Sequence, residues 1–481
     1  MAMLLFLVLS APATAAVTLD DLFDSSARDI PAQGRLTFKQ QAFERLLAAR
    51  GAASVVRAMR RIESGLADLD KRRDKVYARF LKAHKKYFDW RRKKTDDAEA
   101  VPAGINKAFL AAEREIRGVN SIVYNDLAFH EWALTRLAKF QRTPDGDYLV
   151  ALVKDVRHKN PHQRLRCLRL LGIPTDAAAL KALRSASEAE RHPAVAAALA
   201  ATGQTDTGKA LLSDQWTVRA GAIEGFRRQR TRASAATLVR RLAVEKGRLQ
   251  DDLRDALVWI AGDEQPDWAA WLKALPEDWA PSPPRPAAPP SPDDAHPMGT
   301  ASGRTCFGLP TGSERVVLCV DGGAALAAVA KEVERYLGTL PERAQFGIVV
   351  YGAGARVFKR KLIAVTGANR AAAAKWMAGL KLAGRTDIHD GLELAFDLVG
   401  GDGKRPARAD TLVLVALQRP SQVGLSPTRV GNPRQIALEW ARRNALLRVR
   451  LLAFGKSSGG ESYYLQNLAR PYGGGFRPSA R

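Results

Sequence analysis

Apolar residues recur at helical spacing through the N-terminal part of the chain, residues 17–140. Side chains such as Leu66 and Phe80 are separated by dense charge, which predicts a long amphipathic helix. A turn is favoured at Pro102, and a second apolar stripe containing Ile116 follows it. Two long helices joined by a short turn predict an antiparallel helical hairpin of coiled-coil type.

The pattern changes between residues 141 and 280 to shorter helical stretches of related sequence. Four of these stretches share an apolar position, and the four positions lie 30, 23 and 35 residues apart: Leu165, Val195, Val218 and Leu253. Loose periods of this size predict stacked helical pairs, in which one repeat cannot bury its apolar face alone. These segments resemble HEAT repeats.

Residues 281–304 are rich in proline. Because proline fixes φ and lacks a backbone N–H, such a run cannot form a helix or a central strand. It is typical of a semi-rigid extended linker and marks the boundary of a further domain.

After this segment, apolar runs of strand length alternate with helical patterns. The pattern predicts five strands, at 316–320, 346–351, 356–358, 411–417 and 448–454. It also predicts five helices, at 324–337, 370–380, 389–398, 433–444 and 462–468. This alternation predicts a mostly parallel sheet covered on both faces. The expected fold class is therefore multidomain, with an all-α N-terminal part and a Rossmann-like α/β domain over residues 305–481.

Composition adds a strongly basic charge to this picture. The formal net charge is +25, and about +13 of it comes from residue 281 onward. Much of the basic charge is arginine scattered through helices beside alanine, which is typical of solvated helix faces. Binding to nucleic acid or to another anionic polymer stays open as an alternative.

Cysteine usage gives no sign of a disulfide framework or of a zinc site. The chain has three cysteines, Cys167, Cys306 and Cys319, and no CxxC pair. The two that lie in apolar runs, Cys167 and Cys319, are expected to be core residues.

The first residues have the outline of a secretory signal peptide. A short apolar core at residues 4–9 precedes an Ala-Thr-Ala cleavage pattern at 13–15. We expect residues 1–16 to be removed and the mature chain to be exported to the periplasm or the extracellular space. Elsewhere no apolar run is long enough to suggest a membrane span.

Several motifs in the C-terminal part together resemble the von Willebrand factor type A (VWA) domain. They are "RVVLCVDGG", "FGIVVYGAGARVF", "LAGRTDIHDGLELAFD", "ADTLVLVALQRP" and "YLQNLARPYGGGF". The third is the most specific, because Thr-Asp-Ile before an Asp-x-Leu helix is a hallmark of the family. The whole chain resembles exported bacterial proteins that join HEAT-like helices to a C-terminal VWA domain.

The resemblance implies a metal-ion-dependent adhesion site, in which an Asp-x-Ser-x-Ser turn, a threonine and a later aspartate hold Mg²⁺ through oxygen atoms. Asp321 matches the first aspartate and Thr386 matches the threonine. Gly323, Ala325 and Leu417 replace the two serines and the later aspartate. We therefore expect a vestigial site and no cofactor, with Mg²⁺ held by substitute ligands as the alternative.

A partly buried carboxylate still requires partners. We hypothesise that the guanidinium of Arg385 or Arg419 replaces the cation beside Asp321, since its planar fork suits a carboxylate. The alternative is that both arginines face solvent. Asp387 is expected to order its own loop. The expected partner-binding rim consists of Asp321, Gly323, Arg385, Thr386, Asp387 and Arg419.

These features favour a non-catalytic protein-binding or scaffold protein whose partner is another protein. A metal-dependent adhesion module and an electrostatic binder of anionic polymers are the alternatives, and no specific nucleic-acid site is indicated. An enzyme is not expected, because the seven histidines form neither an HExxH motif nor an evident triad. His389 is interpreted as a residue at a helix N-terminus.

Overall fold

The computed structural model describes residues 102–140, 155–171, 177–279, 303–323, 325–352, 354–380, 386–400, 407–418, 433–456 and 460–479, together with helical residues between 37 and 87. The predicted signal peptide and nearly all of the predicted linker lie outside these residues.

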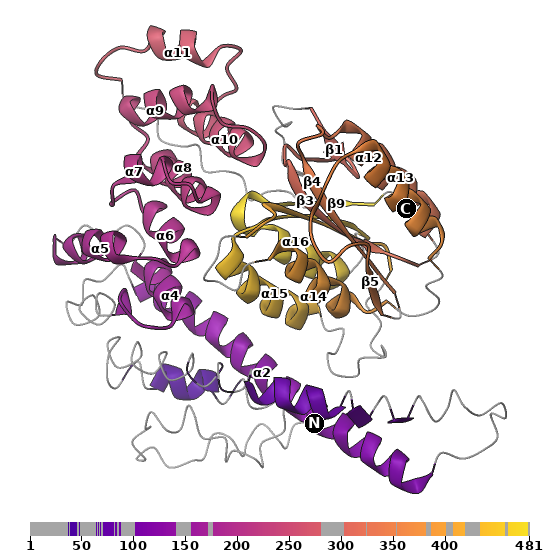
Figure 1. The fold of residues 1–481 in the computed structure, drawn as a ribbon. Helices are drawn as coiled ribbons and strands as arrows, with labels where there is room; N and C mark the ends of the chain where they lie inside the picture. Colours follow the sequence, from indigo (N-terminus) through magenta and orange to yellow (C-terminus); the bar gives the residue numbers. More distant parts are fainter. Residues whose placement is uncertain are drawn as a thin grey trace.

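A helical part and an α/β part lie side by side (Figure 1). The helices of the first part are α2 (Ala103–Phe140), α4 (Pro161–Leu171), α5 (Ala177–Ala189), α6 (Pro193–Ala200), α7 (Thr207–Leu211), α8 (Trp216–Gln229), α9 (Arg232–Leu242), α10 (Arg248–Ala261) and α11 (Trp268–Ala274). This arrangement agrees with the predicted N-terminal helical region.

The long helix α2 packs against helical residues that precede it. The ring of Phe80 lies 6.0 Å from that of Phe109, and Arg79 pairs with Glu115 at 2.6 Å. Ile116 is fully buried in the same cluster. Residues before and after the predicted turn at Pro102 therefore lie against each other, as expected of a hairpin.

The four related segments form α4, α6, α8 and α10. Val195, Val218 and Leu253 are buried at their shared apolar position, and Leu165 is partly buried. Two glycines of α8 let this helix approach α6 closely. A Cβ on Gly221 would lie 2.1 Å from the carbonyl oxygen of Ala197, so any larger residue there would separate the helices.

The α/β part is built on a seven-stranded sheet. Its strands are β3 (Arg315–Asp321), β4 (Gln345–Tyr351), β5 (Ala355–Val357), β6 (Ile363–Ala364), β7 (Thr411–Ala416), β8 (Arg450–Gly455) and β9 (Gly475–Pro478). The order is β5-β4-β3-β7-β8-β9, parallel from β4 to β9, and β5 and β6 pair antiparallel with β4. A separate ladder joins β1 (Thr305–Cys306) to β2 (Leu309–Pro310).

Helices cover both faces of this sheet. They are α12 (Leu326–Thr339), α13 (Gly367–Ala378), α14 (Ile388–Val399), α15 (Pro433–Leu447) and α16 (Gly460–Ala469). Alternate residues of β3 belong to different cores: Leu318 packs in a cluster with α12 and α13, whereas Val317 packs in a cluster with α14, α15 and α16. All five predicted strands and all five predicted helices are confirmed within three residues at each end.

Candidate functional site

The connections that follow the neighbouring strands β3 and β7 lead to opposite sides of the sheet. From β3 the chain moves to β4 on one side, and from β7 it moves to β8 on the other. Such a topological switch point, at the carboxyl ends of the strands, is where ligands bind in open α/β sheets. Asp321 ends β3 at this point, and Leu417 and Gln418 directly follow β7.

Backbone amides hold the carboxylate of Asp321, which is buried with 2% exposure. One carboxylate oxygen accepts the N–H of Gly323 at 2.9 Å. The other accepts the N–H groups of Leu417 at 3.1 Å and of Gln418 at 2.9 Å. Burial raises the pKa of Asp321, and these three backbone donors oppose the rise by stabilising the charged form.

The side chain of Gln418 joins the loops around this carboxylate. Its Oε1 accepts the hydroxyl proton of Thr386 at 2.8 Å. Its Nε2 lies over Gly323, so close that a Cβ on that glycine would be only 1.9 Å away. The amide therefore occupies the space that a side chain at position 323 would need.

Asp387 orders the start of α14. Its side chain accepts the N–H groups of His389 at 3.1 Å and of Asp390 at 3.2 Å, and its own N–H donates to the carbonyl of Gly352 at 2.7 Å. The carboxylate thus acts as a helix cap.

His389 and Tyr351 are buried residues close to the site in the chain and in the sheet. His389 is buried, and its Nδ1 accepts the indole N–H of Trp440 at 3.1 Å. The hydroxyl of Tyr351 donates to the carbonyl of Val415 at 2.7 Å, and its ring lies so close to Gly391 that a Cβ there would be 2.7 Å away. These contacts fix α14 against the ends of β4 and β7.

Arg385 and Arg419 lie outside the described residues, so the proposed guanidinium partner of Asp321 stays a prediction. Gln418 was missed by the sequence reasoning, which examined only the aligned position Leu417. An amide directly after an apolar strand was the available signal, but nothing local shows that it reaches Thr386.

Among the described residues, the oxygen atoms around Asp321 do not complete an octahedral Mg²⁺ site. Three expected oxygen donors are absent at Gly323, Ala325 and Leu417, and the amide of Gln418 occupies the vicinity of the first. Within the described part of the chain, no group of three or more His, Cys, Asp or Glu residues could hold a metal ion.

Comparison with known proteins gives little beyond this geometry. No protein-family model matches the chain, and no curated protein matches it. One solved structure, a von Willebrand factor type A protein from Catenulispora acidiphila, is similar at 20% identity with a TM-score of 0.26. The match covers 33% of this chain and 37% of that protein, so it spans little more than a third of that protein's length. A likeness this weak carries no argument about the site.

Two further observations concern the chain as a whole. Cys167, Cys306 and Cys319 are buried free thiols, in agreement with the prediction of no disulfide framework. Over the ranges that the structure describes, no helix is both long and apolar enough to cross a membrane.

Proposed function

We propose that this chain is a non-catalytic protein-binding protein, and that its VWA-like domain binds a protein partner at the switch-point edge without a metal ion. The proposal rests on one observation: three backbone N–H groups donate hydrogen bonds to the two carboxylate oxygens of Asp321, and the amide of Gln418 lies beside this carboxylate. Because this carboxylate is held internally, a cation is not required to neutralise it.

The edge offers a different surface from a metal site. A metal centre recognises an acidic side chain of its partner, whereas here the end of β7 presents a neutral amide and the partly buried side chain of Leu417. The half-buried rings of Phe307 and Phe454 stack at 5.2 Å near the end of the neighbouring strand β8. A rim of amide and apolar groups fits recognition through shape and hydrogen bonds.

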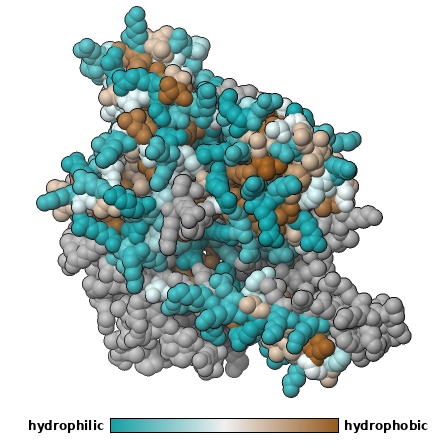
Figure 2. Space-filling view, viewed as in Figure 1, coloured by the Kyte–Doolittle hydropathy of each residue, from teal (hydrophilic) through white to brown (hydrophobic). Residues whose placement is uncertain are grey.

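The space-filling view shows apolar residues on the surface of both parts. They gather in one area over the α/β part and in smaller groups on the helical part (Figure 2). Contiguous apolar surface on a soluble protein is a feature of interaction sites.

The proposal also includes export and a HEAT-like character for the helical part. The sequence of residues 1–16 supports export, and the alternating pairs from α4 to α11 support the repeat assignment. In this account the exported chain acts in assembly at the cell envelope or outside the cell.

Affinity purification of the full chain from its source cells, in buffer with and without EDTA, tests the proposal. We expect the same protein partner in both buffers. Gln418→Lys adds a charge to the rim and should release the partner. Gln345→Lys makes the same exchange at the exposed first residue of β4, at the opposite edge, and should retain it. Loss of the partner in EDTA, or enrichment of nucleic acid in a salt-sensitive manner, would contradict the proposal.

A further inference from the structure

The helical part contacts the α/β part along one side of its stack. Helix α15 packs against α2, α4 and α6, while α8 and α10 reach the edge of the sheet where β3, β7 and β8 begin. The apolar cores are also shared, because residues of α8 and α10 belong to the same cluster as residues of β7, β8 and α15. The inner face of the stack is therefore covered by the chain itself.

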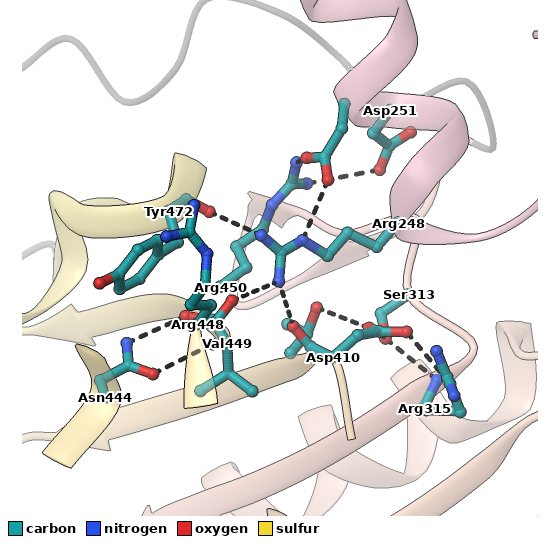
Figure 3. A network of polar contacts seen from close by, with 12 residues as sticks. Arg248, Asp251, Ser313, Arg315, Asp410, Asn444, Arg448, Val449, Arg450 and Tyr472 are labelled. Atoms are coloured by element: carbon teal, nitrogen blue, oxygen red, sulfur yellow. Dashed lines mark hydrogen bonds and ion pairs between the residues drawn. The ribbon is translucent and has the colours of Figure 1, made fainter. Parts of the chain in front are cut away.

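Arg248 crosses from the stack to the sheet at the first residue of α10. Its guanidinium donates to the carbonyls of Asp410 at 2.8 Å, Arg448 at 3.0 Å and Tyr472 at 3.0 Å (Figure 3). These carbonyls belong to residues that lie one to three positions before the first residues of strands β7, β8 and β9. Arg248 is 4% exposed, so the loss of its donors would leave buried carbonyls without these partners.

Arg450 crosses the boundary in the opposite direction. It begins β8, is 5% exposed, and pairs with Asp252 at 2.5 Å and with Asp251 at 3.5 Å, both on α10. Burial disfavours its charged form, but Asp252, Asp251 and Asp255 outweigh burial and raise the pKa of Arg450. The network is therefore reciprocal: each part contributes a buried arginine to acceptors on the other.

Smaller contacts extend this boundary. The indole N–H of Trp216 on α8 donates to the carbonyl of Ala407 at 2.9 Å, just before β7. Gly312 lies so close to the carboxylate of Asp251 that a Cβ there would be 2.1 Å from an oxygen. At the far end, Arg73 pairs with Glu439 of α15 at 2.8 Å.

From this arrangement we propose that the inner face of the helical stack is a binding surface for this chain's own α/β part, and that the two form a permanent intramolecular complex. Separation would expose to water the apolar cluster that residues of α8 and α10 share with residues of β7, β8 and α15. It would also break the hydrogen bonds and ion pairs that Arg248 and Arg450 make across the boundary. The inner face is thus closed to outside partners.

The proposal does not depend on the function proposed for Asp321 and Gln418. It predicts that the proline-rich segment 281–304 is not needed to hold the parts together once the chain has folded. A covalent linker raises the effective concentration of the two parts, but a preformed buried interface persists without it.

Cleavage of the folded full-length protein at a protease site inserted within residues 284–290 tests this directly. After cleavage the two fragments should elute together in gel filtration at about micromolar concentration and in moderate salt. Separation of the wild-type fragments under these conditions would overturn the proposal.

A second experiment identifies the contacts responsible. Arg450→Ala in the cleavable protein should accelerate fragment dissociation about 100-fold or more, because it removes the buried ion pairs with Asp252 and Asp251 that cross the boundary. Arg443→Ala removes an exposed pair with Asp397 within the α/β part and should change dissociation less than about 5-fold. Equal dissociation rates for these variants would contradict the assigned network. Should Arg450→Ala fail to fold, Asp252→Asn serves instead, with the same comparison.

Discussion

The amide of Gln418 leads to a sharp prediction about Gly323. Adding a methyl group in Gly323→Ala places a Cβ 1.9 Å from Nε2 of Gln418, so the amide must move away. Because the displaced group is the end of a flexible side chain, backbone strain is small, and the main cost is the hydrogen bond between Thr386 and Gln418. A bond of this kind contributes about 1 kcal/mol.

The same bond is lost in Gln418→Ala, which gives a double-mutant cycle. Each single variant should lower the free energy of unfolding by about 1 kcal/mol, and the double variant should lower it by about 1 rather than 2 kcal/mol. The coupling is thus about 1 kcal/mol, since one hydrogen bond can be lost only once. Urea unfolding of the full chain, followed by tryptophan fluorescence, measures all three values. Additive costs would refute the placement of the amide over Gly323.

Three further outcomes follow from buried contacts. Gly221→Ala should destabilise the protein by about 3 kcal/mol, because its Cβ would meet the carbonyl of Ala197. The control Gly118→Ala, on the open face of α2, should be neutral or stabilising by up to about 1 kcal/mol. Urea midpoints compare the two variants, and equal effects would contradict the α6–α8 contact. Burial, with Arg442 and His192 nearby, lowers the pKa of His162 to about 3. Below about pH 6.5 the unfolded state binds a proton at this residue that the folded state does not, so His162 should lower stability by about 1.4 kcal/mol per pH unit. In pH-dependent unfolding, His162→Gln should remove this contribution and leave that of His130, whose pKa is also lowered by burial. Burial raises the pKa of Asp255 to about 6 despite Arg450, so its charged form lowers the stability of the folded state at neutral pH. Asp255→Asn should therefore be more stable than the wild type by up to about 3 kcal/mol at pH 7.5, and this difference should disappear as the pH falls from 6 toward 4. A difference in stability that does not depend on pH would contradict the assignment.

Much of the α/β part could be predicted because its strands are continuous apolar runs. Residues 316–320 and 411–416 are buried on both faces of the sheet, and a run of that length between helical patterns has few other interpretations. The strands β1, β2, β6 and β9 were missed. Each has two to four residues, which is too short to show a period.

The contact between the two parts was beyond sequence reasoning for a different reason. Arg248 and the carbonyl of Asp410 are 162 residues apart, and no local pattern links them. Scattered arginines in helices were interpreted as lying on solvated faces, which is wrong for Arg248 of α10, because it is buried. The proline-rich segment suggested independent domains, whereas the structure places the parts against each other.

The site was predicted in part. The position of Asp321 at the end of a strand followed from the chain pattern, but its hydrogen-bond partners did not. The structure shows three backbone N–H groups donating to the carboxylate, whereas the expected arginine partner, Arg385 or Arg419, lies outside the described residues and stays a prediction. Backbone donors leave no signature in a sequence, because every residue except proline carries one.

Isothermal titration calorimetry with Mg²⁺ and Mn²⁺ on the full chain tests the central claim most directly. We predict no saturable binding at concentrations up to about millimolar, for the wild type and for Asp321→Ala alike, because the site lacks the oxygen donors that these ions require. Micromolar, saturable binding by the wild type that disappears in Asp321→Ala would contradict it.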